Sequence, residues 1–151
     1  ELHWYFDKTI SVYNTIASGY FDTIGVYKKL NEEQHAIVHQ WLSFLNIESK
    51  AQQSLSTLST SQQRLALLAR AFVKNPSLLI LDEPCQGLDE QQVKDFVELV
   101  DILCSQSHKT LIYVSHYENE IPKCINNTLV LDRVNQNKSV NKIYNQTAIA
   151  V

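Results

Sequence analysis

The stretch Ser77-Leu78-Leu79-Ile80-Leu81-Asp82-Glu83-Pro84 decides the fold of this chain. Its four consecutive apolar residues, with no polar alternation, are typical of a strand buried on both faces, as in a parallel sheet. A helix does not fit between Pro76 and Pro84, because proline disrupts a helix interior. We therefore expect a short buried strand that ends at two adjacent carboxylates, Asp82 and Glu83.

A turn and a long helix follow this strand. The turn spans Cys85 to Asp89, and its Gly87 is free to adopt a positive φ. Asp89 is a natural N-cap with Gln92 as its reciprocal partner. Apolar residues at helical spacing predict the buried stripe of this helix: Val93, Phe96, Val97, Val100 and Leu103.

A second apolar strand is expected over Thr110–Ser115, and His116 follows it directly. A strand, helix, strand unit makes a right-handed crossover with the two strands parallel. Ligands bind outside the carboxyl ends of such strands, so Glu83 and His116 should project from the same sheet edge. An acid pair there can hold a hydrated Mg²⁺ and orient a water for phosphoryl transfer. The alternative is a strand that simply ends in two solvated acids.

Helices dominate the first half of the expected structure. Residues 9–18 have helical spacing, and a loop or broken helix follows between Gly19 and Gly25. A firmer helix begins at Asn31, with Gln34 completing a capping box. Its apolar stripe comprises Ile37, Val38, Trp41, Leu42 and Leu45.

Two histidines on that helix have metal-ligand spacing. His35 and His39 lie four residues apart, but no acidic residue completes an H-E-x-x-H pattern. A solvated face is therefore the favoured interpretation of this pair.

The next helix is introduced by Leu58-Ser59-Thr60-Ser61-Gln62-Gln63-Arg64. Ser59 is a natural N-cap, and Asn75 and Pro76 mark the end of the helix. One face behind the cap carries Leu65, Leu68, Ala69 and Phe72. A helix N-terminus with hydroxyls and free N–H groups can bind an anion, although an ordinary serine cap explains the same residues.

The last third of the chain contains weaker signals. A short helix is expected over Tyr117–Ile121, ended by Pro122, and two short strands over Thr128–Asp132 and Lys142–Tyr144. Residues 135–141 are typical of a polar turn, and the tail beyond Asn145 is expected to fray.

Composition sets the class of protein. The chain has 151 residues, 44% of them hydrophobic, which suffices for one ordinary globular domain. A net charge of −3 shows no electrostatic footprint for nucleic acid, and no run approaches a membrane span. Cys85, Cys104 and Cys124 lack metal-binding or disulfide spacing, so a reduced, cytoplasmic protein is expected. Because methionine is absent, we expect a piece of a longer protein.

Four motifs in this order resemble those of the ABC-type ATPases, whose fold is a P-loop NTPase core of the α/β class with a helical subdomain. The likeness covers about Thr9 to Tyr144. The motifs resemble, in turn, the signature, the Walker B strand, the D-loop and the switch histidine: Leu58-Ser59-Thr60-Ser61-Gln62, Leu79-Ile80-Leu81-Asp82-Glu83-Pro84, Gly87-Leu88-Asp89 and Ser115-His116.

The resemblance implies ATP and Mg²⁺ as cofactors and a role for each matching residue. Asp82 would hold Mg²⁺ through water, Glu83 would act as general base on the attacking water, and His116 would contact the γ-phosphate. The remaining positions would address the nucleotide of a partner ATPase domain or line that interface: Ser59, Thr60, Ser61, Gln62 and Asp89.

This sequence departs from the family pattern in two ways. No G-x-x-x-x-G-K-[ST] phosphate loop occurs, so the chain resembles a partial domain that is inactive alone. Residues 1–58 would form a helical subdomain, and residues 59–151 the signature helix and the second part of the ATPase core. Thr60 and Ser61 replace two signature glycines, and their added Cβ atoms limit how closely a phosphate can approach.

Within the family, the segments around Ser18–Tyr27, Gln40–Leu42 and Leu65–Ala71 are similar to the second half of a bacterial tandem protein associated with molybdate transport or photorepair. The implied function is an ATP-hydrolysing transporter subunit that binds a membrane permease through its helical part, at the inner face of the membrane. Two alternatives stay open: a tandem ATPase without a transport role, and a degenerate module that does not hydrolyse ATP. Direct binding to nucleic acid is not expected from the charge.

Overall fold

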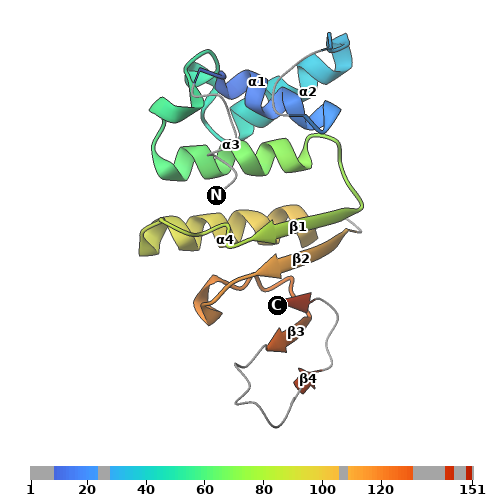
Figure 1. Cartoon of the computed structure of the whole chain (residues 1–151), viewed down its shortest axis with the longest axis vertical. Helices are drawn as coiled ribbons and strands as arrows, with labels where there is room; N and C mark the ends of the chain where they lie inside the picture. Colours follow the sequence, from blue (N-terminus) through green and yellow to red (C-terminus); the bar gives the residue numbers. More distant parts are fainter. Residues whose placement is uncertain (1–8, 24–27, 106–108, 131–141, 145–148, 151) are drawn as a thin grey trace. The chain divides into compact units, whose positions relative to one another are not determined.

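The computed structural model describes residues 9–23, 28–105, 109–130, 142–144 and 149–150. The chain forms two compact units, Glu1–Pro76 and Ser77–Val151. Figure 1 shows the first as a group of helices and the second as a sheet with a helix along it. The sequence-based division after residue 58 followed the order of the motifs. The packing boundary instead follows Pro76, because the helix behind Ser59 packs against helices that precede it.

The helical unit contains three α-helices and shorter turns of 3₁₀-helix in the part of the chain that the structure describes. In chain order they are α1 (Val12–Ala17), η2 (Ser18–Phe21), α2 (Glu32–Phe44), η3 (Glu48–Lys50), η4 (Leu55–Thr57) and α3 (Thr60–Phe72). Helix α1 lies against both α2 and α3 and is the centre of this unit. The core that they share includes Val12, Ile16, Val38, Leu42, Leu68, Ala69 and Phe72.

Side-chain caps fix where these helices begin. The Asn31 side chain accepts from the Gln34 N–H at 2.8 Å and the Gln34 amide oxygen accepts from the Asn31 N–H at 3.0 Å, which confirms the predicted capping box. The first helix begins later than predicted, because Ser11 is its N-cap and accepts from the Asn14 N–H. Of the predicted α2 stripe, Ile37 and Trp41 are only half-buried.

The junction of η2 with α3 is unusually close. A Cβ atom on Gly19 would lie 2.3 Å from the Arg70 carbonyl oxygen, so only glycine fits there without a shift of the α3 backbone. The Arg70 guanidinium reinforces the junction, because it donates to Ser18 Oγ at 3.0 Å and to the Thr23 carbonyl at 3.2 Å. Burial lowers the pKa of Arg70, an effect that the charge of Asp22 partly opposes.

The second unit is built on a sheet of mixed direction. Its elements are β1 (Leu78–Asp82), α4 (Glu90–Ser105), β2 (Thr110–Val114), η5 (Glu118–Glu120), β3 (Asn127–Val130), β4 (Lys142–Tyr144) and β5 (Ile149–Ala150). The strand order is β1-β2-β5-β3-β4, and among the strands that the structure describes the β3–β4 pairing alone is antiparallel. The predicted parallel pairing of the strands on either side of α4, β1 and β2, is confirmed, with Leu78 opposite Thr110 and Asp82 opposite Val114.

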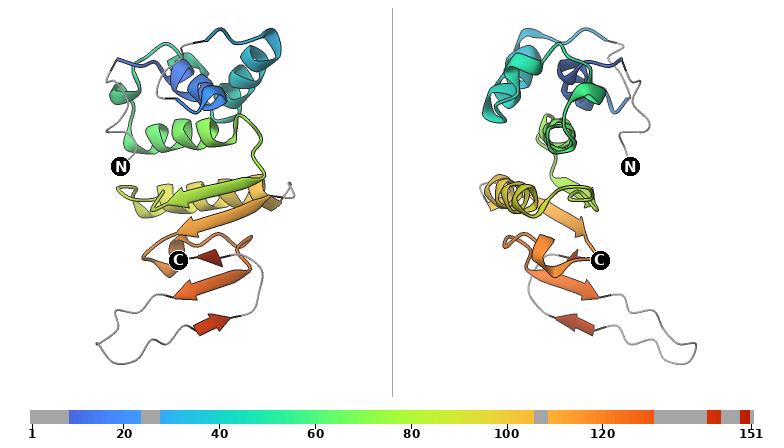
Figure 2. Two further views of the ribbon diagram at one scale, coloured as in Figure 1. Left: turned by 45° about the vertical axis from the view of Figure 1, so that its right-hand side comes forward. Right: turned by 90° about the vertical axis from the view of Figure 1, so that its left-hand side faces the viewer.

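Helix α4 covers one face of β1 and β2, as the two orientations in Figures 1 and 2 agree. Leu79 and Leu81 are buried, whereas Leu78 and Ile80 are 49% and 60% exposed. The prediction of a strand buried on both faces is therefore wrong for this chain, since its apolar residues alternate between a covered and an uncovered face. On α4, Cys104 is buried in place of the predicted Leu103, which is half-buried like Val97.

The end of the chain differs from expectation. Instead of fraying throughout, it forms β5, which pairs in parallel with both β2 and β3. The predicted strand over Lys142–Tyr144 is confirmed as β4, and the predicted short helix near Tyr117 is one turn of 3₁₀-helix, η5. Asp132 and the predicted turn at 135–141 lie outside the described residues. Among the helices described, none is long and apolar enough to cross a membrane.

Candidate functional site

Glu83 occupies a special backbone position just after β1. Its φ is 43°, in the left-handed region that side-chain-bearing residues seldom adopt. The conformation is held because the Glu83 N–H donates to the Val114 carbonyl at 3.0 Å, which extends the β1–β2 ladder by one bond. Non-glycine residues in sparsely populated backbone conformations often belong to functional sites.

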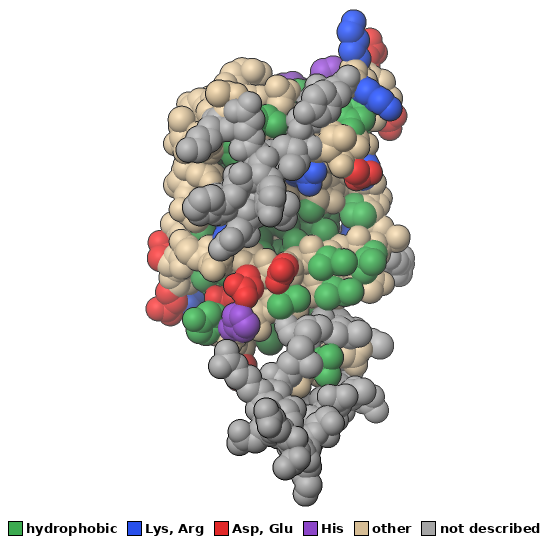
Figure 3. Space-filling view, viewed as in Figure 1, with side chains coloured by type: hydrophobic (Ala, Val, Ile, Leu, Met, Phe, Trp, Pro, Cys, Tyr) green, Lys and Arg blue, Asp and Glu red, His purple; other side chains and the backbone are tan. Residues whose placement is uncertain are grey.

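The Glu83 carboxylate lies 2.7 Å from the His116 imidazole, measured between Oε1 and Nε2. The predicted convergence of these residues at one sheet edge is thus confirmed, because β1 and β2 are adjacent and in register. The His116 side chain is 75% exposed and that of Glu83 is 38% exposed, so a ligand can reach both. Figure 3 shows a histidine against acidic side chains, beside a row of hydrophobic ones.

Asp82 is the last residue of β1 and is exposed. Among the described residues, no group of three or more His, Cys, Asp or Glu could enclose a metal ion. Mg²⁺ does not need such an enclosure, because it usually keeps several waters and binds one or two carboxylates together with substrate phosphates. Asp82 therefore fits the ligand set of a nucleotide-bound Mg²⁺.

The turn after Glu83 is anchored in the core of its unit. Cys85 is 2% exposed, and its Sγ lies 3.3 Å from the Tyr113 hydroxyl, which is also buried. Burial, and after it the hydrogen bond with Cys85, raises the pKa of Tyr113 well above its usual value. Gly87 has a φ of 83°, as predicted, and this brings the chain round to α4.

Asp89 is the N-cap of α4. Its carboxylate accepts from the Gln92 N–H at 2.9 Å, and the Gln92 side chain accepts from the Asp89 N–H at 3.2 Å. The predicted reciprocal cap is confirmed. Asp89 is exposed, so the cap leaves it accessible to a partner.

The signature-like residues stand at the N-terminus of α3, in the helical unit. Ser59 is the N-cap, and a capping box joins it to Gln62 with distances of 3.3 and 3.4 Å. Thr60 and Ser61 are the first two residues of the helix. Lys50 donates to the Gln62 side-chain oxygen at 2.8 Å, which adds a positive charge at this helix end.

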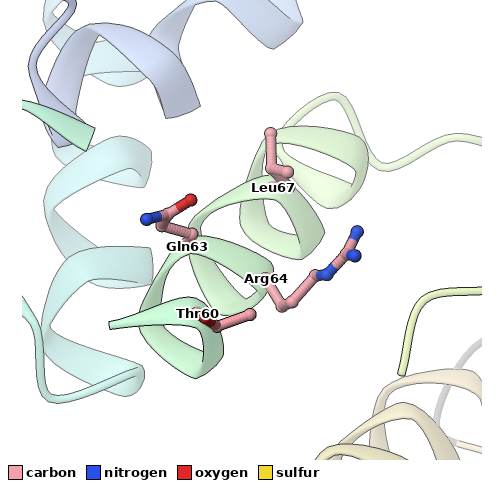
Figure 4. A pocket seen from close by; sticks show the side chains of 4 residues that line it. All are labelled: Thr60, Gln63, Arg64 and Leu67. Atoms are coloured by element: carbon pink, nitrogen blue, oxygen red, sulfur yellow. The ribbon is translucent and has the colours of Figure 1, made fainter. Parts of the chain in front are cut away.

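A pocket of about 240 Å³ lies along the first two turns of α3. Thr60, Gln63, Arg64 and Leu67 line it, and Figure 4 shows these side chains projecting from successive turns of the helix. The Gln63 amide is held by the Leu58 carbonyl at 2.9 Å.

Two further side chains that the sequence analysis did not single out touch these sites. Lys50 binds Gln62, and Glu120 accepts a hydrogen bond from Ser115 at 2.6 Å. Both belong to 3₁₀ turns, η3 and η5, for which local sequence gives little signal. The sequence signal for Glu120 was limited to a charged residue five positions after Ser115, and Lys50 lies 12 positions before Gln62.

A parallel strand, helix, strand unit with an acid pair and a histidine beyond its carboxyl ends is typical of α/β proteins that bind a ligand at that edge of the sheet. The sequence profile of the family described as "ABC transporter" matches residues 3–86. The chain belongs to this family and contains part of its P-loop NTPase fold.

Curated relatives of the chain carry the same assignment. The ABC transporter ATP-binding protein ModF of Escherichia coli K12 is 44% identical over 130 residues, which cover 85% of this chain and 26% of ModF. The molybdate import ATP-binding protein MolC of Haemophilus influenzae is 28% identical over 125 residues, covering 83% of this chain and 49% of MolC. The high-affinity zinc uptake system ATP-binding protein ZnuC of Bacillus subtilis is 29% identical over 123 residues, covering 82% and 53%.

Solved structures show the same architecture. An ABC transporter in an inward-facing conformation superposes with a TM-score of 0.74 and 27% identity, over 90% of this chain and 53% of the other. MJ1267, an ATP-binding cassette of an ABC transporter, superposes with a TM-score of 0.71 at 22% identity, over 83% and 53%, a likeness of fold. The chain thus spans between about a quarter and a half of the length of these relatives.

Proposed function

We propose that this chain supplies the signature helix and the hydrolytic edge of an ATP-hydrolysing subunit of an ABC transporter. The observation that carries the proposal is the 2.7 Å contact between Glu83 and His116 beyond the ends of two adjacent parallel strands. A carboxylate and an imidazole in contact, both accessible, suit the polarisation of water next to a phosphate.

Each residue of the edge has a separate task in this proposal. Glu83 accepts a proton from the attacking water, and His116 contacts the terminal phosphate and is oriented by Glu83. Asp82 holds Mg²⁺ through water, and the ion neutralises charge on the phosphate oxygens when bound. Glu83 has a left-handed backbone and its carboxylate lies 2.7 Å from His116, while Asp82 keeps its place in the strand opposite Val114.

In this proposal the phosphate loop comes from elsewhere in the parent protein, since this sequence has no G-x-x-x-x-G-K-[ST]. The exposed Leu78 and Ile80 on β1 support this proposal, because parallel sheets are normally covered on both faces. We propose that other segments of the parent protein pack on this face. The chain alone would not hydrolyse ATP, because the principal grip on the triphosphate is absent.

The N-terminus of α3 would address the nucleotide held by a second ATPase domain. The residues proposed for this contact, with the D-loop residue that would line the interface, are Ser59, Thr60, Ser61, Gln62 and Asp89. The dipole of the 13-residue helix α3 and the N–H groups of its first turn would attract phosphate, and Lys50 adds a positive charge there. Thr60 and Ser61 would weaken this contact relative to the glycines of the family pattern.

The test is hydrolysis of ATP by the full-length protein that contains this chain. Glu83→Gln should lower kcat by about 100-fold or more, because a positioned general base contributes that much. The matched control is Glu90→Gln, which alters an exposed acid of the same unit whose described partner is Lys94. A Glu83→Gln variant that retains the wild-type rate would refute the proposal and would favour a degenerate, non-hydrolytic module.

Molybdate is the proposed substrate class of the parent transporter. The likeness to ModF and MolC supports it, while the likeness to zinc uptake proteins leaves metal import as the competing assignment. A membrane permease would then bind the helical unit and hold the protein at the cytoplasmic side of the membrane. Deletion of the gene should reduce molybdate uptake and leave zinc uptake unchanged. No effect on either ion would favour the tandem ATPase without a transport role.

A further inference from the structure

Ser115 lies between the last residue of β2 and His116, and its hydroxyl closes a turn. Ser115 Oγ accepts from the Tyr117 N–H at 3.1 Å and donates to Glu120 Oε2 at 2.6 Å. The Tyr117 carbonyl oxygen also lies 3.4 Å from Ser115 Oγ. The hydroxyl has one proton, and it donates this proton to the Glu120 carboxylate, which is nearer and charged. The Glu120 N–H in turn donates to the Tyr117 carbonyl at 3.2 Å.

His116 depends on this turn because the sheet does not hold it. The β2 ladder ends at Val114, whose carbonyl binds the Glu83 N–H, so Glu83 is fixed by the sheet itself. His116 is two residues further on, with a side chain that is 75% exposed. A side chain with so little packing keeps a fixed direction only if its backbone is fixed on both sides.

Glu120 fixes that backbone from the far end of the turn. Glu120 and Ser115 are both half-buried. Burial raises the pKa of Tyr113, and the hydrogen bond with Cys85 and then the negative charge of Glu120 raise it further. The turn follows directly from Val114, and the preceding residue of β2, Tyr113, is the buried tyrosine that contacts Cys85, two residues after Glu83. Both partners of the Glu83–His116 pair are thus anchored through β2.

We propose that Ser115 and Glu120 are positioning residues: their hydrogen bond holds the 115–120 turn so that the His116 imidazole meets Glu83. The consequence for catalysis rests on the function proposed above, whereas the geometric consequence does not. Because the carboxylate can only accept, it fixes the direction of the Ser115 proton and leaves the oxygen free to accept from Tyr117.

The kinetic test uses the full-length protein. Ser115→Ala and Glu120→Ala should each lower kcat about 10-fold and leave KM for ATP within about twofold, since a misdirected reacting group impairs the chemical step. Ser115→Thr keeps the hydroxyl and should restore most of the wild-type rate. Glu118→Gln is the control, because it removes a carboxylate from the same 3₁₀ turn without touching Ser115. Melting temperatures identify any variant that fails to fold.

A second measurement does not require turnover. In full-length protein with ¹³C-labelled histidine, Glu83→Gln should shift the His116 ring signals. The same change in a Ser115→Ala background should shift them much less, because the ring no longer meets residue 83. Equal shifts in both backgrounds, or a kcat for both alanine variants equal to that of Glu118→Gln, would overturn the proposal. If Glu83→Gln leaves ATP hydrolysis intact, the proposed function is refuted. The positioning role of Ser115 and Glu120 is then decided by the His116 ring signals in the two backgrounds.

Discussion

At position 19, a side chain as small as a methyl group would collide with the backbone of α3. Gly19→Ala should therefore destabilise the helical unit by about 2–3 kcal/mol, a typical cost of overpacking a tight core. Tryptophan fluorescence during urea unfolding measures this unit, because Trp41 packs on Phe72 within it and the other tryptophan, Trp4, also precedes Pro76.

The control for this prediction is Gln40→Ala, which changes an exposed residue of α2 and should alter the free energy of unfolding by less than about 0.5 kcal/mol. If Gly19→Ala matches that control, η2 and α3 are further apart than the structure shows.

Cys124 offers a second test at the scale of one residue. Burial, followed by its interaction with Asp101, raises the pKa of the Cys124 thiol from 9.0 to about 12. Asp101 is held there because it accepts from the Cys124 N–H at 2.7 Å. At pH 8.5 Cys124 should react with iodoacetamide at least about 100-fold more slowly than in the urea-unfolded chain, because the thiolate is the nucleophile. Mass spectrometry of the peptides separates it from the other two cysteines.

The same shift gives a dependence of stability on pH. The folded-state pKa lies above the unfolded value, so the stability contributed by the protonated thiol is complete below about pH 9 and is lost as the pH rises toward 12. Asp101→Asn keeps an acceptor for the Cys124 N–H but removes the charge, so it should speed alkylation of Cys124. An unchanged rate would show that burial alone protects the thiol.

Among the elements, the starts of α2, α3 and α4 were the most predictable features. The caps at Asn31, Ser59 and Asp89 depend on residues three positions apart, and a single sequence contains that information. The left-handed backbone of Glu83 was not predictable, because it depends on a bond to a strand 31 residues away. Strand β5 was missed because two residues between distant partners carry no pattern of their own.

The candidate site likewise contains some contacts that the sequence predicts and others that it does not. Glu83 and His116 could be placed together because parallel strands bring their carboxyl ends to one edge. The contacts of Glu120 and Lys50 could not be predicted, since each comes from a short 3₁₀ turn whose course is set by packing.

Asp89 caps α4 and also carries a charge, and two substitutions can separate the effect of the cap from that of the charge. Asp89→Ala should cost about 1 kcal/mol and speed hydrogen exchange in the first turn of α4 about fivefold, because the cap is lost. Asp89→Asn should leave exchange close to wild type, since asparagine caps as well as aspartate. Faster exchange in the asparagine variant would mean that the charge, rather than the cap, stabilises the helix end.

For the whole molecule, the altered signature predicts a compromise between stability and turnover. Thr60→Gly with Ser61→Gly should raise ATP turnover of the full-length protein roughly fivefold, if closer phosphate approach gains about 1 kcal/mol in the transition state. The same pair should destabilise α3 by about 1–2 kcal/mol, because glycine in a helix loses more conformational freedom on folding. An unchanged ATPase rate would show that these positions do not limit the trans contact.

The threading of β5 between β2 and β3 has a consequence for biosynthesis. Strands β1 and β2 can pair as soon as they leave the ribosome, whereas among the described residues β3 and β4 join them through Ile149 and Ala150 of β5. We therefore expect the β1–β2 pair and the β3–β4 pair to join into one sheet only after residue 150 has emerged. A stop codon placed before Ile149 removes β5, so the β3–β4 pair should lose its connection to β2 and be cut readily by cellular proteases. The contact between Glu83 and His116 should remain, because it depends on β1 and β2.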